Sequence, residues 1–257
     1  MTGGLDPAAE ARWPAGVLGR ATTRRGGVST GPFASLNLAT SGEAGDDAVS
    51  DVAENRARLL RSLGIDAVCW LRQVHGTGVH RIEAPPEAGA AAPVADAAVT
   101  RLRGVAVAVL TADCLPVLLA AEDGSAVGAA HAGWRGLAAG VLEATVAALE
   151  TAPERIRAWL GPAIGPTAFE VGPEVRDAFL AADPGAASAF RRGRGDRWHA
   201  DLWALARRRL RLAGVRQVAG GGVCVHADPE RYYSWRRDGK RTGRQATLAW
   251  LSPRPRS

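Results

Sequence analysis

The chain of 257 residues is predicted to fold as a single α+β domain in which mixed or antiparallel β-sheets pack between helices. Two observations favour this class. Short β-rich runs, two of them joined by the hairpin turn signal Asp123-Gly124, are mixed with segments of helical periodicity. The order of these elements is too irregular for a βαβ repeat. No linker or fixed-period repeat divides the chain, so we expect a flexible leader at residues 1–15 and one domain at 16–252.

In the first part of the domain, Thr22–Leu38 is rich in Gly, Ser and Thr and is predicted to consist mostly of turns. Apolar residues at helical spacing predict a helix over Asp46–Leu63, which the following Gly64 ends. β-rich runs predict strands at Cys69–Leu71 and Val79–Ile82.

The centre and the C-terminal part of the chain repeat this mixture. Helices are predicted where apolar residues recur at helical spacing, at Gly136–Glu150, Pro173–Ala182 and Leu202–Ala213. Strands are predicted at Val105–Thr111, Pro116–Ala121, Ala126–Ala130, Ile156–Leu160, Val215–Gly222, Val223–Val225, Tyr232–Trp235 and Gln245–Leu251.

The composition is that of a globular protein, with 47% hydrophobic and 23% charged residues. The net charge is +6, and Lys240 is the only lysine. Arginines are dense at 191–197, 207–211 and 236–244, but no RNA-recognition, zinc-finger or helix-turn-helix motif accompanies them. We therefore expect a solvated basic surface and no nucleic-acid partner, with single arginines available to bind a small anion.

The chain has three cysteines, a small and odd number that argues against a disulfide framework and favours a reducing compartment. The first residues lack the basic and apolar regions of a signal peptide. The most apolar segment, Val105–Ala121, is interrupted by Asp113 and falls short of the roughly 18 apolar residues of a membrane span. We expect a cytoplasmic protein without a membrane partner.

Two histidines and one cysteine stand where predicted strands end and loops begin, at His75, Cys114 and His131. Two imidazoles and one thiolate suit zinc, with a fourth coordination position left open for water or a substrate. The ligands are 39 and 17 residues apart, without a short ligand pair. Spacing alone therefore favours packed or solvated side chains over a metal site.

Asp113 adjoins Cys114 and has two interpretations. It is either a turn residue between two strands or a general acid/base beside a metal ligand. Adjacent side chains on a strand point in opposite directions, so Asp113 shares a pocket with Cys114 only if the chain bends between them. Cys224 and His226 form an i, i+2 pair that suits a second metal site or, as we favour, the lining of a pocket.

Several short sequence motifs are more specific than the spacing of the candidate ligands. They cover residues 17–251 and include Thr23-Arg24, Gly26-Gly27-Val28-Ser29, Ser35-Leu36-Asn37-Leu38, Glu54-Asn55-Arg56, Gln73-Val74-His75-Gly76, Ala95-Asp96-Ala97, Thr111-Ala112-Asp113-Cys114-Leu115-Pro116, His131-Ala132-Gly133-Trp134-Arg135-Gly136, Tyr233-Ser234-Trp235-Arg236-Arg237-Asp238 and Gly243-Arg244-Gln245. Through these motifs the chain resembles the YfiH-like family. That family is described as laccase-domain or polyphenol oxidase proteins, as purine nucleoside phosphorylases and as peptidoglycan editing factors.

The resemblance implies that His75, Cys114 and His131 are zinc ligands in a surface pocket. It also implies phosphorolysis of adenosine, inosine, guanosine and methylthioadenosine, and deamination of adenosine. Asp113 and Cys114 are then candidate catalytic residues, with Asp113 as the proton shuttle. The candidate ligands of phosphate are Arg24, Arg72 and the catalytic candidate Arg135, and those of the ribose hydroxyls are Asn37 and Gln73. The sequence departs from the family pattern at Glu43-Ala44, where His-Val is usual.

Two other activities compete with this interpretation. A copper-dependent polyphenol oxidase needs roughly ten histidines for its copper centres, and the chain has five. A hydrolase that edits peptidoglycan precursors would use Cys114 as a nucleophile with a histidine partner. We favour the zinc enzyme over both, with purine nucleosides and phosphate as its partners, and we favour a monomer.

Overall fold

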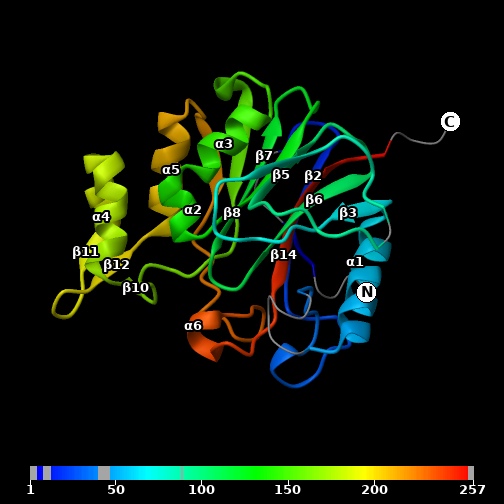
Figure 1. Cartoon of the computed structure of the whole chain (residues 1–257), viewed down its shortest axis with the longest axis horizontal. Helices are drawn as coiled ribbons and strands as arrows, with labels where there is room; N and C mark the ends of the chain where they lie inside the picture. Colours follow the sequence, from blue (N-terminus) through cyan, green and yellow to red (C-terminus); the bar gives the residue numbers. More distant parts are fainter. Residues whose placement is uncertain (1–4, 8–12, 40–46, 88, 254–257) are drawn as a thin grey trace.

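The computed structural model describes residues 5–7, 13–39, 47–87 and 89–253, which form three β-sheets flanked by helices (Figure 1). The five-stranded sheet has the order β1-β2-β14-β6-β3, from β1 (Leu5–Pro7), β2 (Val17–Thr22), β3 (Ala67–Cys69), β6 (Val105–Thr111) and β14 (Gln245–Leu251). The six-stranded sheet has the order β13-β9-β7-β8-β5-β4, from β4 (Val79–Ile82), β5 (Ala97–Thr100), β7 (Leu115–Ala121), β8 (Val127–Ala132), β9 (Ile156–Leu160) and β13 (Gln217–Gly220).

A small third sheet has the order β10-β12-β11, from β10 (Glu170–Val171), β11 (Phe190–Arg192) and β12 (Trp198–Ala200). The α-helices of the described residues are α1 (Val49–Leu63), α2 (Trp134–Ala139), α3 (Val141–Ala148), α4 (Pro173–Ala182), α5 (Leu202–Leu212) and α6 (Trp235–Asp238). Short 3-10 turns occur at η1 (Gly31–Phe33), η2 (Pro153–Arg155) and η3 (Pro184–Ala189). None of the described helices has both the length and the apolar character needed to cross a bilayer.

The two large sheets stack face to face, and strand periodicity explains why. On β6, Val107 and Val109 face a core shared with Leu118 of β7, while Ala108 on the other face packs into the cluster that contains Leu59 of α1. The opposite face of β7 packs against α2, α3 and α5. Figure 1 shows α1 on one side of the stacked sheets and α2, α3 and α5 on the other. The predicted α+β domain of sheets between helices is confirmed.

Most predicted elements overlap elements of the structure, with several differences. The predicted strand Cys69–Leu71 lies at Ala67–Cys69, and the predicted strand Val223–Val225 is wrong, since Cys224 forms only an isolated bridge with Ala163. Gly140 has φ of +105° and divides the predicted helix Gly136–Glu150 into α2 and α3. The predicted strand Tyr232–Trp235 is wrong, since Ser234 caps α6 by accepting a hydrogen bond from the Arg237 N–H. The strand predicted from Val215 is shorter, because the chain leaves β13 at a run of three glycines with positive φ. The small third sheet was not predicted.

At the N-terminus, Leu5–Pro7 of the expected leader pairs as β1 with β2. Residues 1–4 and 8–12 lie outside the described residues, and so do Asp46 and the substitution at Glu43-Ala44. The described part of the first predicted helix begins at Val49 and ends at Leu63, and Gly64 follows as its C-cap with the left-handed φ of +62°.

Candidate metal centre

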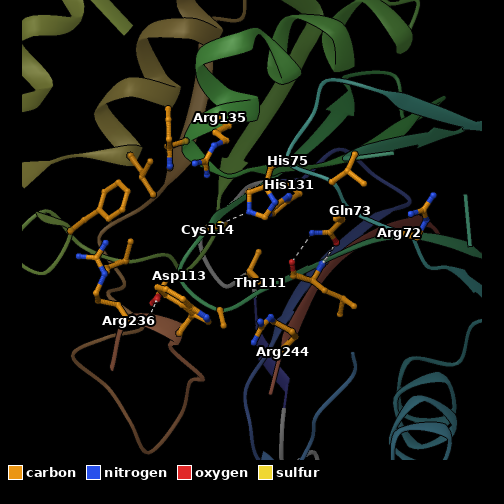
Figure 2. A pocket seen from close by; sticks show the side chains of 18 of the residues that line it. Arg72, Gln73, His75, Thr111, Asp113, Cys114, His131, Arg135, Arg236 and Arg244 are labelled. Atoms are coloured by element: carbon orange, nitrogen blue, oxygen red, sulfur yellow. Dashed lines mark hydrogen bonds between the residues drawn. The ribbon is translucent and has the colours of Figure 1, made fainter. Parts of the chain in front are cut away.

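A cavity of about 860 Å³ opens where the ends of β6, β7 and β8 meet the loop after β3 and helices α2 and α6 (Figure 2). The residues that line it are Arg72, Gln73, Val74, His75, Ala92, Leu110, Thr111, Ala112, Asp113, Cys114, His131, Trp134, Arg135, Ile164, Phe169, Leu202, Trp235, Arg236 and Arg244. A volume of this size is typical of sites for small molecules.

The three predicted ligands meet in this cavity. The ligand atoms of His75, Cys114 and His131 all lie within 4.8 Å of one another, and this is the one such group of side chains in the described ranges. The thiol of Cys114 lies 3.8 Å from Nε2 of His75. The two imidazole rings meet edge to face, with centroids 4.8 Å apart. Cys224 and His226 belong to no such group among the described residues, and the Cys224 thiol accepts a hydrogen bond from the Gly165 N–H.

Asp96 holds this arrangement together, although in the sequence it stands out only as a member of a motif. Its carboxylate is fully buried and accepts hydrogen bonds from the backbone N–H groups of Val74, His75 and Gly76. Oδ1 also lies 2.9 Å from Nδ1 of His131. A carboxylate only accepts hydrogen bonds, so His131 keeps a proton on Nδ1, and its Nε2 is the atom that would bind a metal after losing its own proton.

The thiolate of Cys114 and the protonated ring of His131 stabilise each other's charge. Burial raises the pKa of the Cys114 thiol, but the neighbouring imidazoles of His131 and His75 outweigh it and lower that pKa to about 6. Burial lowers the pKa of His131, but the Cys114 thiolate and the Asp96 carboxylate raise it to about 9. Cys114 is therefore a thiolate at neutral pH, which is the form that binds a metal or acts as a nucleophile.

The donor set fits a metal ion with three protein ligands and one open position. Gly133 closes one side of the centre, since a Cβ there would lie 2.8 Å from Cδ2 of His75 and 3.1 Å from Sγ of Cys114. The backbone of Gly133 has φ of −59°, which any residue can adopt. The need for glycine here is therefore the space taken up by the ligands.

Asp113 lies at a bend with φ of +96°, so it and Cys114 do line the same cavity. Its carboxylate accepts hydrogen bonds of 2.6 Å from the Ser234 hydroxyl and from the Arg236 N–H. Asp113 therefore ties the bend that carries Cys114 to α6, which brings Trp235 and Arg236 to the cavity.

The other predicted site residues divide into two groups. Arg72, Gln73 and Arg135 line the cavity. The amide group of Gln73 is already used, because it forms hydrogen bonds with the N–H and the carbonyl of Leu110. Arg135 stacks on Trp134, with 4.5 Å between the guanidinium carbon and the ring centroid.

Arg24 and Asn37 are not among the residues that line the cavity, and their assignment as substrate ligands stays a prediction. The Arg24 guanidinium donates to the carbonyls of Ala34 and Pro229. Asn37 is fully buried and donates to Asp47, while its own carbonyl oxygen accepts from the Arg244 N–H. Asn37 is thus linked to the lining of the cavity by its hydrogen bond with the backbone N–H of Arg244.

Arg236 and Arg244 line the cavity but were not predicted to bind a substrate. Both lie in the arginine-dense stretch 236–244 and in quoted motifs, so a signal was present in the sequence. Arg236 donates to the Glu170 carbonyl and lies over the Phe169 ring. Figure 2 shows Arg135 and Arg236 on one side of the three ligands and Arg72 on the other.

Comparison with known proteins identifies the family of this chain. The family described as multi-copper polyphenol oxidoreductase laccase matches residues 20–252. A purine nucleoside phosphorylase of Xylella fastidiosa is 55% identical over 93% of this chain and 94% of its own. Purine nucleoside phosphorylase YfiH of Escherichia coli is 49% identical over 93% of this chain and 95% of its own.

Among solved structures, a Neisseria meningitidis protein is 45% identical to this chain. The two structures superpose with a TM-score of 0.90 over 98% of this chain and 100% of the other. The chain therefore belongs to the YfiH family, whose domain is described as a multi-copper polyphenol oxidoreductase laccase.

Proposed function

We propose that this protein is a zinc-dependent purine nucleoside phosphorylase that also deaminates adenosine. The observation that carries the proposal is the thiolate and two imidazoles of one centre, grouped within 4.8 Å in a cavity that arginines line. The names of the relatives support the phosphorylase assignment. The preferred substrates are adenosine, inosine, guanosine and methylthioadenosine, and the enzyme acts as a cytoplasmic monomer.

Different residues of the cavity have different roles in this proposal. His75, Cys114 and His131 would hold zinc, which supplies a Lewis acid at its open position. Asp96 fixes the tautomer of His131 and the loop of His75. Asp113 is the candidate proton shuttle for deamination. Arg72 and Arg135 are candidate ligands of phosphate, since guanidinium groups match its oxygens in bidentate fashion.

The lining of the cavity suits a purine nucleoside. Ile164, Phe169 and Trp235 provide apolar and aromatic surface on the side of α6, where a purine base would stack. Gln73, Thr111 and Arg135 also line the cavity and provide polar groups for the ribose and phosphate. Closing this cavity around the substrates would exclude water, so that phosphate rather than water attacks C1′.

The family's description favours a second candidate, a copper-dependent polyphenol oxidase. The residues count against it, because the chain has five histidines and the described residues contain one three-ligand group. A multicopper oxidase needs a blue-copper site together with further copper centres. Stoichiometric copper in the purified protein together with turnover of phenols would decide for this candidate.

A third candidate is a hydrolase that edits peptidoglycan precursors. The low pKa of Cys114, with the His75 imidazole 3.8 Å away, favours it. Its substrate would be a muropeptide precursor that carries the wrong amino acid. Such a reaction would need no metal ion.

The decisive experiment is a product assay with adenosine, inosine and methylthioadenosine, with and without phosphate, alongside metal analysis. Phosphate-dependent release of adenine or hypoxanthine by zinc-loaded protein supports the proposal. Cys114→Ala should lose zinc and turnover together, whereas Cys224→Ala, outside the cavity, should keep both. A folded Cys114→Ala variant that still releases bases would overturn the metal mechanism. Turnover of a muropeptide precursor by metal-free protein would establish the third candidate.

A further inference from the structure

The three candidate ligands come from three separate segments of the chain, and two of the three pairs of segments are linked directly. Cys114 immediately precedes β7, which pairs with β8 as far as the strand end that carries His131. Asp96 links the ring of His131 to the backbone of His75. The remaining pair is His75 with Cys114, whose thiol lies 3.8 Å from Nε2 of His75.

The strands that lead to these two ligands separate before they reach them. β3 pairs in parallel with β6 only at Ala67–Cys69. Farther along the same segment, Arg72 pairs with Val94 instead of with β6. β6 continues past the end of β3, and its Leu110 is buried. The N–H and carbonyl of Leu110 therefore need a partner that β3 does not provide, because buried backbone groups are rarely left unpaired.

The side chain of Gln73 is that partner. Its Oε1 accepts the Leu110 N–H at 2.7 Å, and its Nε2 donates to the Leu110 carbonyl at 2.9 Å. A side-chain amide has the same kinds of donor and acceptor as a peptide group, so these bonds take the place of one backbone pairing of the sheet. Figure 2 shows both bonds on the wall of the cavity. They use one of the two amide N–H groups, so this role is compatible with a contact between Gln73 and a substrate.

We propose that Gln73 is a positioning residue that sets the distance between His75 and Cys114. Gln73 lies two residues before His75, and Leu110 lies four residues before Cys114. Both segments bend beyond the Gln73–Leu110 pair, at His75 with φ of +60° and at Asp113 with φ of +96°, so strand pairing does not place these ligands. Together with the two links above, this pair connects all three ligand segments to one another. The inference rests on the metal centre of the proposed function.

The test uses Gln73→Met, which keeps the length of the side chain and removes both hydrogen bonds. Zinc affinity is measured by competition with a chelator, and the geometry of the centre by the absorption bands of cobalt-substituted protein. We expect zinc affinity to fall about tenfold to a hundredfold, the range for losing an outer partner of a metal ligand, and the cobalt bands to shift. Gln217→Met, at an exposed glutamine of β13 that does not line the cavity, is the matched control and should change neither.

A second variant and two further measurements separate positioning from folding. Gln73→Asn keeps the amide but is one methylene shorter, so it cannot reach both groups of Leu110, and it decides the test if Gln73→Met does not fold. A residue that only stabilised the fold would lower the melting temperature of metal-free protein and leave the cobalt bands unchanged. At saturating zinc we expect kcat for inosine to fall by a larger factor than KM rises, because the centre is displaced while the rest of the cavity is intact.

Wild-type zinc affinity and cobalt bands in a folded Gln73→Met or Gln73→Asn variant would overturn the positioning role. A change confined to the KM for inosine would also overturn it and would make Gln73 a ligand of the substrate alone. Metal binding requires no turnover, so shifted cobalt bands in variants of a protein that cleaves no nucleoside would support the positioning role while rejecting the phosphorylase. Wild-type protein that binds neither zinc nor cobalt would reject the metal centre and this inference with it.

Discussion

Asp96 joins two candidate metal ligands, His75 and His131, that are far apart in the sequence. Its Oδ1 lies 2.9 Å from Nδ1 of His131 and accepts the backbone N–H of His75, also at 2.9 Å. One fully buried carboxylate therefore fixes the ring of one ligand and the loop of the other. Burial raises the pKa of Asp96, but hydrogen bonds from His131 and from the loop backbone lower it below its usual value. The carboxylate is consequently charged wherever the site operates.

The first prediction concerns this carboxylate. Asp96→Asn keeps the size of the side chain but points an amide N–H toward groups that are themselves donors. We expect zinc affinity to fall about tenfold to a hundredfold, as is common when the outer partner of a ligating histidine is removed. Competition with a chromophoric chelator measures this affinity directly. Asp177→Asn, on the exposed face of α4, is the matched control.

A melting curve of metal-free Asp96→Asn separates loss of the site from loss of the fold. Wild-type zinc affinity in a folded Asp96→Asn variant would contradict a positioning role for Asp96. A metal-free Asp96→Asn variant that is already unfolded at the assay temperature would instead place the effect of Asp96 on the fold.

The second prediction concerns the space beside the ligands. Gly133→Ala places a Cβ 2.8 Å from His75 and 3.1 Å from the Cys114 thiol, without backbone strain. We expect the fold to persist while zinc affinity falls at least tenfold, because the ligands must move apart. Gly78→Ala is the control, since its nearest new contacts would be 3.8 Å away. Zinc content after dialysis measures the effect, and full occupancy in Gly133→Ala would contradict it.

Much of the architecture could be predicted from local pattern. Strands β4, β6, β9 and β14 and helix α4 have the predicted ends, because their periodicity stops at clear turn residues. The break at Gly140 was missed because Leu137, Val141 and Leu142 continue one buried face across it. The short strands β10–β12 carry too few residues for a period to appear.

The sequence could predict which residue types form the candidate site, but not which of their polar groups are already used in hydrogen bonds. The residues of the motifs pointed to the three candidate ligands, and these lie close together in the structure. Arg24 and Asn37 look equally suited to a substrate in the sequence, yet their donors are used by backbone carbonyls and by Asp47. The role of Asp96 could not be predicted, because its partners are mostly backbone N–H groups and a sequence does not show which backbone groups a side chain meets.

The third prediction concerns the reactivity of two cysteines. The pKa of Cys114 is about 6, whereas burial raises the pKa of Cys69 to about 11. In metal-free protein, iodoacetamide should therefore modify Cys114 well before Cys69 at pH 7.5. The rate at Cys114 should fall as the pH drops through about 6, because the thiolate is protonated there. Peptide mapping identifies the modified residue.

Zinc provides the control for this reaction, because a ligating thiolate is shielded and zinc-loaded protein should resist modification. A Cys114 rate that rises mainly between pH 8 and 10 would show that the imidazoles do not stabilise its thiolate. Rapid modification of Cys69 would show that the buried core opens on the timescale of the experiment.

The last prediction distinguishes two roles for Asp113. Ser234→Ala removes the 2.6 Å hydrogen bond from the Ser234 hydroxyl and leaves the carboxylate in place. If Asp113 mainly positions α6, the KM for nucleosides should rise about tenfold with little change in kcat, because Trp235 and Arg236 shift together. If Asp113 instead transfers a proton, the loss of one of its two hydrogen-bond donors should lower kcat for adenosine deamination about tenfold with little change in KM, because the carboxylate is less firmly held for the transfer. Ser50→Ala, on the exposed start of α1, should change neither quantity. Measuring kcat and KM separately for adenosine therefore assigns the role, since a structural tie alone changes KM and leaves kcat where it was.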